Sequence, residues 1–188
     1  MNKQTYTRAG LWMIVSSFMM MLSLFPSILA AFPNLPIVKS IPATSRNLNL
    51  ERVSIGKIKL NMEERAVIRL LGTPRNRSQR FGACTGSNEA DLSYKMLSIN
   101  TTETTANNGR FEVNAITTTN PQYSTPEGIH VGDLITKALK FYPVTKTVNE
   151  DKSGTSWSYF EDRTMISLTF KVGKNSRISS ISLSQLMC

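Results

Sequence analysis

The sequence predicts an α+β protein made of two repeats, each a helix followed by antiparallel strands, after an N-terminal segment that is a signal peptide or an anchor. Two observations predict this fold. The same succession of patterns occurs twice along the chain, and in each copy apolar residues at helical spacing precede short segments of alternating apolar and polar residues. With 188 residues, the chain is long enough for one ordinary domain or two very small ones.

The N-terminal segment, residues 1–31, has the pattern of a secretory signal. Lys3 and Arg8 are basic, no charged residue occurs from Ala9 through Val38, and the apolar centre is followed by small residues. An uncleaved membrane anchor over residues 9–31 is the alternative, because about 20 apolar residues suffice to span a bilayer. Both alternatives place the rest of the chain outside the cytoplasm, in the periplasm or the extracellular space.

We expect residues 32–52 to form an extended linker, because they contain three prolines and show no sustained periodicity. The first repeat is expected over residues 53–120 and the second over residues 127–188. The connector between them is bounded by Pro121 and Pro126.

Each repeat begins with a predicted helix. In the first, Ala66, Val67, Leu70 and Leu71 have helical spacing, and Gly72-Thr-Pro74 ends the helix. In the second, apolar residues at the same spacing are closed by a proline. These residues are Ala138, Leu139, Phe141 and Tyr142, followed by Pro143.

Three predicted strands follow each helix. They cover Leu92–Tyr94, Met96–Ile99 and Phe111–Thr119 in the first repeat, and Trp157–Tyr159, Met165–Val172 and Arg177–Ser184 in the second. A unit of about 60 residues buries little surface alone. We therefore expect the two repeats to share a sheet or to pack end to end.

The helix entries carry a resemblance to a known family. The runs Ile58-Lys-Leu60-Asn-Met62, Leu71-Gly72-Thr-Pro74 and Thr125–Asp133 resemble the tandem repeats of the β-lactamase-inhibitor-protein-like (BLIP-like) fold. That fold includes small outer-membrane lipoproteins of the SmpA/OmlA type, which assist the assembly of β-barrel proteins. The resemblance implies helices on one face of an antiparallel sheet and a concave opposite face that binds proteins. The lipobox cysteine of those lipoproteins is missing here.

The composition limits the possible partners and cofactors. A net charge of +9 suits an anionic membrane surface or an acidic envelope protein, and an exported protein rarely meets nucleic acid. One His and two Cys cannot supply the usual four ligands of a His/Cys zinc site, and no phosphate-binding or dinucleotide-binding glycine motif occurs. We therefore expect no metal, no cofactor and no nucleic-acid partner.

The two cysteines predict a disulfide between Cys84 and Cys188, because paired cysteines in an exported chain are usually oxidised. Unpaired or intermolecular thiols are an alternative. A further alternative is a thiol enzyme in which Cys84 is the nucleophile and His130 is the base.

Two groups of residues are candidate binding sites. The arginines Arg65, Arg69, Arg75, Arg77 and Arg80 are the densest basic stretch and could dock an anionic surface, or they could be an ordinary solvated face. Large aromatic residues on an open sheet face would be protein-binding anchors, or they could belong to the core beneath the helices. These aromatic residues are Tyr94, Trp157 and Tyr159.

The function expected from the sequence is therefore a non-catalytic, extracytoplasmic envelope protein that binds another protein or the membrane surface, with assembly of envelope proteins as one such role. A soluble inhibitor of an extracytoplasmic enzyme is one alternative. The thiol enzyme using Cys84 and His130 is the other.

Overall fold

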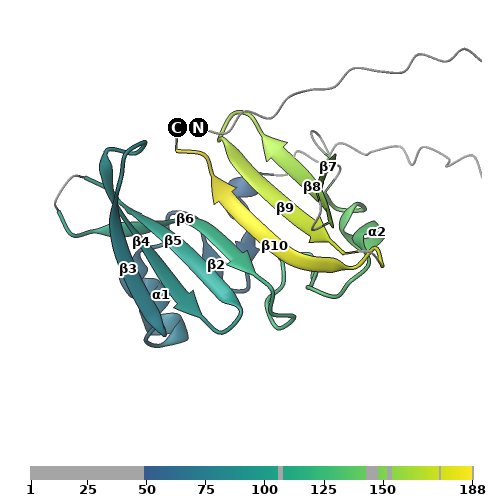
Figure 1. Cartoon of the computed structure of the whole chain (residues 1–188), viewed down its shortest axis with the longest axis horizontal. Helices are drawn as coiled ribbons and strands as arrows, with labels where there is room; N and C mark the ends of the chain where they lie inside the picture. The colour runs from purple at the N-terminus through teal and green to yellow at the C-terminus, as the bar shows by residue number, and fades with distance from the viewer. Residues whose placement is uncertain (1–48, 106–107, 143–147, 152–153, 174, 188) are drawn as a thin grey trace, which may run out of the picture. The chain divides into compact units, whose positions relative to one another are not determined.

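The protein is a mainly antiparallel β-protein, as the computed structural model in Figure 1 shows. The structure describes residues 49–187 apart from 106–107, 143–147, 152–153 and 174. The predicted α+β class with two helix-plus-strands repeats is wrong. The two α-helices have only 8 and 4 residues, whereas eight strands form one sheet. Two segments for which the sequence predicted neither helix nor strand, residues 76–82 and 148–151, form additional strands, and this shifts the balance from helix to sheet.

A short N-terminal layer precedes the sheet. The 3-10 helix η1 (Leu50–Arg52) leads into a hairpin of β1 (Ser54–Ile55) and β2 (Ile58–Lys59). Its turn contains Gly56 at φ 63°, a backbone conformation that glycine adopts without strain. Leu50, which the sequence placed in the linker, is fully buried, and its N–H donates to Glu161 Oε2 at 3.1 Å.

The first predicted helix is confirmed as α1 (Glu64–Leu71). Gly72 ends it at φ 81°, and its N–H donates to the Ile68 carbonyl at 2.9 Å. This is the glycine stop expected from the sequence. The second predicted helix is present as α2 (Ile135–Ala138), but it ends before Leu139, Phe141 and Tyr142, the later residues of the predicted apolar pattern.

Eight strands form a single sheet with the order β3-β4-β5-β6-β10-β9-β8-β7. Two meanders, each of four consecutive strands, meet where β6 pairs with β10; Leu183 is opposite Ile116 in that pair. The strands are β3 (Asn76–Gly82), β4 (Ser87–Tyr94), β5 (Leu97–Glu103), β6 (Phe111–Thr118), β7 (Val148–Asp151), β8 (Gly154–Glu161), β9 (Ile166–Val172) and β10 (Ile178–Gln185).

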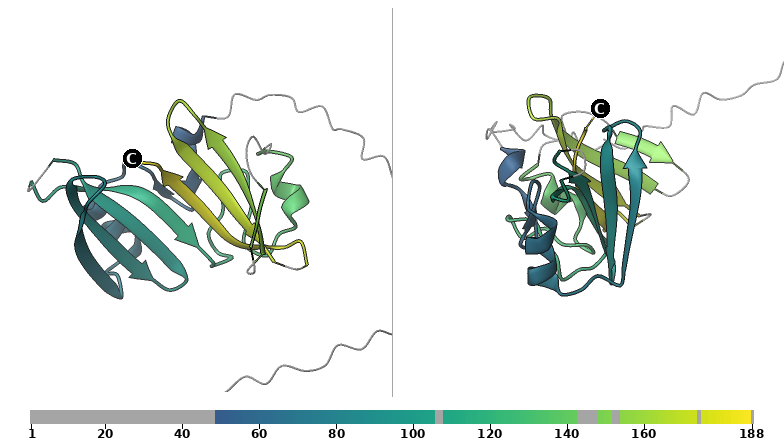
Figure 2. Two further views of the ribbon diagram at one scale, coloured as in Figure 1. Left: turned by 45° about the horizontal axis from the view of Figure 1, so that its top comes forward. Right: turned by 90° about the vertical axis from the view of Figure 1, so that its left-hand side faces the viewer.

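The core lies on one face of this sheet. Alternate strand residues such as Ile99, Ile116, Leu168 and Leu183 are fully buried, and they pack with residues of η1, the β1–β2 hairpin and both α-helices. Figure 2 shows α1 on one side of the strands. Within the part of the chain that the structure describes, no element covers the opposite face, which we call the uncovered face.

The predicted signal or anchor segment, residues 1–31, lies outside the described residues, as do residues 32–48 of the predicted linker. Between residues 49 and 187, with the gaps given above, none of the helices has the length and apolar character needed to cross a bilayer.

Candidate functional site

The uncovered face carries short polar side chains across the middle of the sheet. Alternation in β9, and in β10 after an irregularity between Ile178 and Ser180, sends the apolar residues to the core and leaves hydroxyl groups on this face. The hydroxyls bond to one another across strands, with Thr117 Oγ1 3.0 Å from Ser182 Oγ and Ser158 Oγ 2.9 Å from Thr169 Oγ1. This centre is polar and uncharged.

Charged residues lie on the same face over β3, β4 and β5. Arg80 forms ion pairs with Glu89, at 2.8 Å, and with Asp91. Asn100 Nδ2 donates to Asp91 Oδ1 at 2.7 Å. Two carboxylates thus face one guanidinium, so this part of the uncovered face is slightly acidic.

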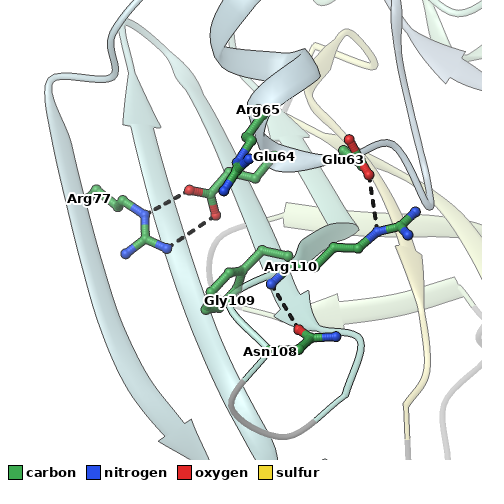
Figure 3. Close-up of a pocket in the computed structure, with 8 residues that line it drawn as sticks. Glu63, Glu64, Arg65, Arg77, Asn108, Gly109 and Arg110 are labelled. Atoms are coloured by element: carbon green, nitrogen blue, oxygen red, sulfur yellow. Dashed lines mark hydrogen bonds and ion pairs between the residues drawn. The ribbon is translucent and has the colours of Figure 1, made fainter.

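A separate pocket lies on the other side of the sheet, between the start of α1, β3 and the β5–β6 turn (Figure 3). Its volume is about 340 Å³. Glu64 forms its centre: the carboxylate accepts from Arg77 Nε at 2.8 Å and Nη2 at 3.4 Å, and from Thr101 Oγ1 at 2.9 Å. Glu64 is buried, and Arg77 also lies 5.0 Å from the Phe111 ring centroid.

A second arginine of the pocket is also paired with carboxylates, whereas a third is not. Arg110 pairs with Glu63 at 3.0 Å and with Glu112 at 3.1 Å. Arg65 is exposed and forms no ion pair with any residue that the structure describes. Because Glu64 and Glu63 are each paired with an arginine, the geometry of the pocket supports a structural role in fixing α1 to the sheet.

A second pocket of about 430 Å³ lies near the β3–β4 turn and the end of β10. Its lining is polar and includes Thr102, Glu112 and Asn114. Over the described part of the chain, no group of three or more His, Cys, Asp and Glu side chains is placed to hold a metal ion.

The five arginines predicted as one basic surface divide into two sets. Arg77 and Arg80 are neutralised by carboxylates on opposite faces of β3. Arg65 and Arg69 on α1 and Arg75 in the following loop are exposed, and the described residues provide none of them with an ion-pair partner. Only these last three form a candidate anionic-surface site.

The predicted binding aromatics lie on the core side of the sheet. Tyr94, Trp157 and Tyr159 are partly buried and pack against the core. Tyr94 Oη donates to the Gly72 carbonyl at 3.1 Å. Burial raises the pKa of Tyr94 and of Tyr159, and a nearby carboxylate adds to the rise in each. Of the two alternatives left open by the sequence, the structure places these residues with the core.

The cysteine and histidine of the thiol-enzyme alternative have other partners. Cys84, in the β3–β4 turn, is disulfide-bonded and therefore has no free thiolate to act as a nucleophile. The predicted partner, Cys188, lies outside the described residues, so the Cys84–Cys188 pairing stays a prediction. His130 Nδ1 lies 2.8 Å from the Pro121 carbonyl oxygen.

Asp133 organises the segment before α2. Its carboxylate accepts from the His130 N–H and from Lys137 Nζ, both at 2.8 Å. Burial alone would raise the pKa of Asp133, but these two hydrogen bonds and the lysine charge outweigh it and lower the pKa.

Sequence reasoning missed β3, although this strand forms one edge of the sheet. Its only apolar side chain is Phe81, which is 67% exposed, and polar residues occupy both of its faces. A strand at an edge needs little apolar alternation. The segment therefore shows no alternation of apolar and polar residues that would identify it as a strand.

The fold and the site define a mainly antiparallel β-protein with one sheet face buried by a thin helical layer and one polar face uncovered. No family model, curated protein or solved structure matches the chain. The resemblance to the BLIP-like fold and to SmpA/OmlA-type proteins therefore stays a prediction.

Proposed function

We propose that this chain is a non-catalytic binding protein of the cell envelope, exported by means of residues 1–31, whose uncovered face binds another protein. The observation that carries the proposal is the division of one eight-stranded sheet into a buried apolar face and an uncovered polar face.

The chemistry of the uncovered face suits a protein partner. Ser and Thr side chains lose little conformational entropy when they are immobilised, and their hydroxyls can donate or accept hydrogen bonds. Paired strands hold them in fixed positions, as the 3.0 Å contact between Thr117 and Ser182 illustrates. A rigid array of small polar groups beside the cluster around Arg80 matches the polar character of non-obligate interfaces.

A single substitution at the centre of this face tests the proposal. We expect Thr117→Arg to reduce partner binding at least about tenfold, because a long charged side chain would stand between the sheet and its partner. Thr136→Arg, on α2, is the matched control: the same substitution at an exposed position outside the sheet. The measurement is capture of envelope proteins by the full-length tagged chain, followed by affinity measurement with the purified partner.

Retention of full binding by Thr117→Arg, or equal loss in both variants, would contradict use of the uncovered face. The identity of the partner separates the two binding roles. An extracytoplasmic enzyme held in a soluble 1:1 complex would indicate an inhibitor, whereas a membrane assembly component would indicate an assembly role.

The arginines Arg65, Arg69 and Arg75 favour a second candidate function, docking on an anionic membrane surface. They are exposed on α1 and the loop after it, and Leu70 beside them is 42% exposed. Exposed cations next to an apolar side chain suit the headgroup region of an anionic bilayer.

Replacing Arg65, Arg69 and Arg75 with Gln is expected to weaken binding to anionic vesicles about 100-fold, since each basic residue contributes about 1 kcal/mol near such a surface. The control variant replaces Lys95, Lys140 and Arg163 with Gln, which removes the same charge elsewhere. Flotation of the full chain with phosphatidylglycerol-rich vesicles would be compared with flotation with neutral vesicles. Binding through the apolar N-terminal segment contributes to both measurements, so their difference reports the binding that depends on lipid charge. Equal losses in the two variants would show a non-specific charge effect and contradict the site.

A further inference from the structure

The outer edge of β3 is available for pairing. β3 is the first strand in the sheet order, and no described strand pairs with its outer side, which Figure 1 shows at one end of the sheet. Six of its seven residues are exposed, and only Gly82 is buried. A free edge of this length presents unsatisfied N–H and C=O groups to a further strand.

The sequence of β3 fits pairing with a second copy of itself. In an antiparallel pair, residues directly opposite each other point to the same face of the sheet. Two identical strands related by a two-fold axis meet this condition only when the residue at the centre of the pair is opposite its own copy. A pair centred on Gln79 uses all seven residues from Asn76 to Gly82, because Gln79 is the middle residue. That register places Arg77 opposite Phe81 and Ser78 opposite Arg80.

No like charges are opposite each other in that register. Pairs centred on Arg77 or on Arg80 would instead place a guanidinium directly against its own copy, which is unfavourable. In the register centred on Gln79, Arg77 of one copy meets the exposed ring of Phe81 of the other, an arrangement suited to a cation–π contact.

Intramolecular ion pairs further lower the repulsion between two copies. Arg77 is paired with Glu64 at 2.8 Å, and Arg80 is paired with Glu89 and Asp91. The edge therefore carries little uncompensated positive charge, in contrast to edge strands that use free Lys or Arg to prevent association.

We propose that two copies of this chain associate edge to edge through antiparallel pairing of β3 with β3, centred on Gln79, so that their two sheets become continuous. The ladder has seven residues per copy, and an interface of this size gives a weak, reversible dimer. The pairing uses the backbone edge of β3, which borders the uncovered face at Arg80 and follows Arg75 directly in the sequence.

Disulfide trapping tests both the association and its register. In Gln79→Cys, the new thiols of two copies face each other at the spacing of an antiparallel residue pair, which lies within the range of a disulfide. We expect the full chain carrying this substitution to form a covalent dimer under mild oxidation. Ser78→Cys is the matched control, because its thiols would lie on a diagonal about 7–8 Å apart. The dimer yield of Gln79→Cys should be at least about fivefold higher.

Reversible association is tested with the native cysteines alone. Sedimentation of the full chain in one mild detergent, at concentrations up to about 1 mM, is expected to show a monomer–dimer equilibrium. Phe81→Arg should shift it at least about tenfold towards monomer, because two guanidinium groups would then be opposite each other. Leu70→Arg, the same charge change on α1, should leave it unchanged.

Equal trapping by Gln79→Cys and Ser78→Cys would overturn the register. A dimer that Phe81→Arg does not weaken would assign association to other parts of the chain and overturn the proposal, and so would a monomer at every concentration.

Discussion

Replacing Cys84 with Ser is expected to lower the free energy of unfolding by about 4–5 kcal/mol, the largest effect that we predict for a single substitution. Cys84 is disulfide-bonded, and the predicted partner Cys188 would close a loop of about 100 residues. Cross-linking so long a loop removes many conformations from the unfolded chain. The loss should appear as a lower denaturant midpoint.

Two controls make this measurement specific. Ala83→Ser introduces the same side chain at the neighbouring exposed position and should change the free energy of unfolding by less than about 0.5 kcal/mol. Wild-type protein under reducing conditions should match Cys84→Ser. If Cys84→Ser retained wild-type stability, or if peptide mapping joined Cys84 to a second molecule, the predicted loop would be wrong.

Replacing Glu64 with Ala is expected to cost about 2–3 kcal/mol. The substitution removes a buried carboxylate that accepts hydrogen bonds from Arg77 (Figure 3). The same carboxylate also accepts a hydrogen bond from Thr101. Breaking a fully buried ion pair costs about 3–5 kcal/mol. The smaller value follows because the Arg77 side chain is 34% exposed and can be solvated by water.

The neighbouring residue provides the control for this prediction. Glu63 also pairs with an arginine, but its side chain is 45% exposed and it makes no capping hydrogen bond to α1. Glu63→Ala should therefore cost less than about 1 kcal/mol. Chemical unfolding would measure the loss of unfolding free energy in both variants. Equal losses would show that the hydrogen bonds of Glu64 contribute nothing beyond a surface ion pair.

The strands that the sequence predicted correctly are those with one buried face. Period-two alternation in β9 and β10 marks them directly, because Leu168, Phe170, Ile181 and Leu183 must all face the core. The first helix was equally predictable, since an apolar stripe is closed by Gly72.

The fold class was not predictable in the same way. β3 and β7 are edge strands, and each gains its order from pairing with one neighbour. Backbone pairing at an edge does not depend on apolar side chains, so polar residues such as Ser78 and Arg80 are compatible with it. The sequence of β3 therefore resembled a basic loop. The end of α2 was mispredicted because Tyr142 lies at helical spacing from Ala138 but beyond the helix. Its ring is buried and contacts Phe170, and this packing in a turn requires an apolar residue just as a helix face does.

The candidate site was predicted only in part. The concentration of arginines in one stretch is evident from the sequence, but their partners are distant along the chain. Arg77 meets Glu64 across the helix–sheet contact, and Arg80 meets Asp91 across a strand pair. The arginines that keep an uncompensated charge are therefore determined by the tertiary structure. They cannot be identified from the local sequence.

The pairing of β6 with β10 determines when folding can finish. β6 ends at Thr118 and β10 begins only at Ile178, yet the two strands pair in the middle of the sheet. A polypeptide emerging N-terminus first would leave one side of β6 unpaired over Ala115–Thr118 until β10 arrives, and contacts so distant along the sequence form slowly. During that interval the half-built sheet is prone to aggregation. Deletion of β10 would therefore open the sheet at its centre rather than shorten it at an edge.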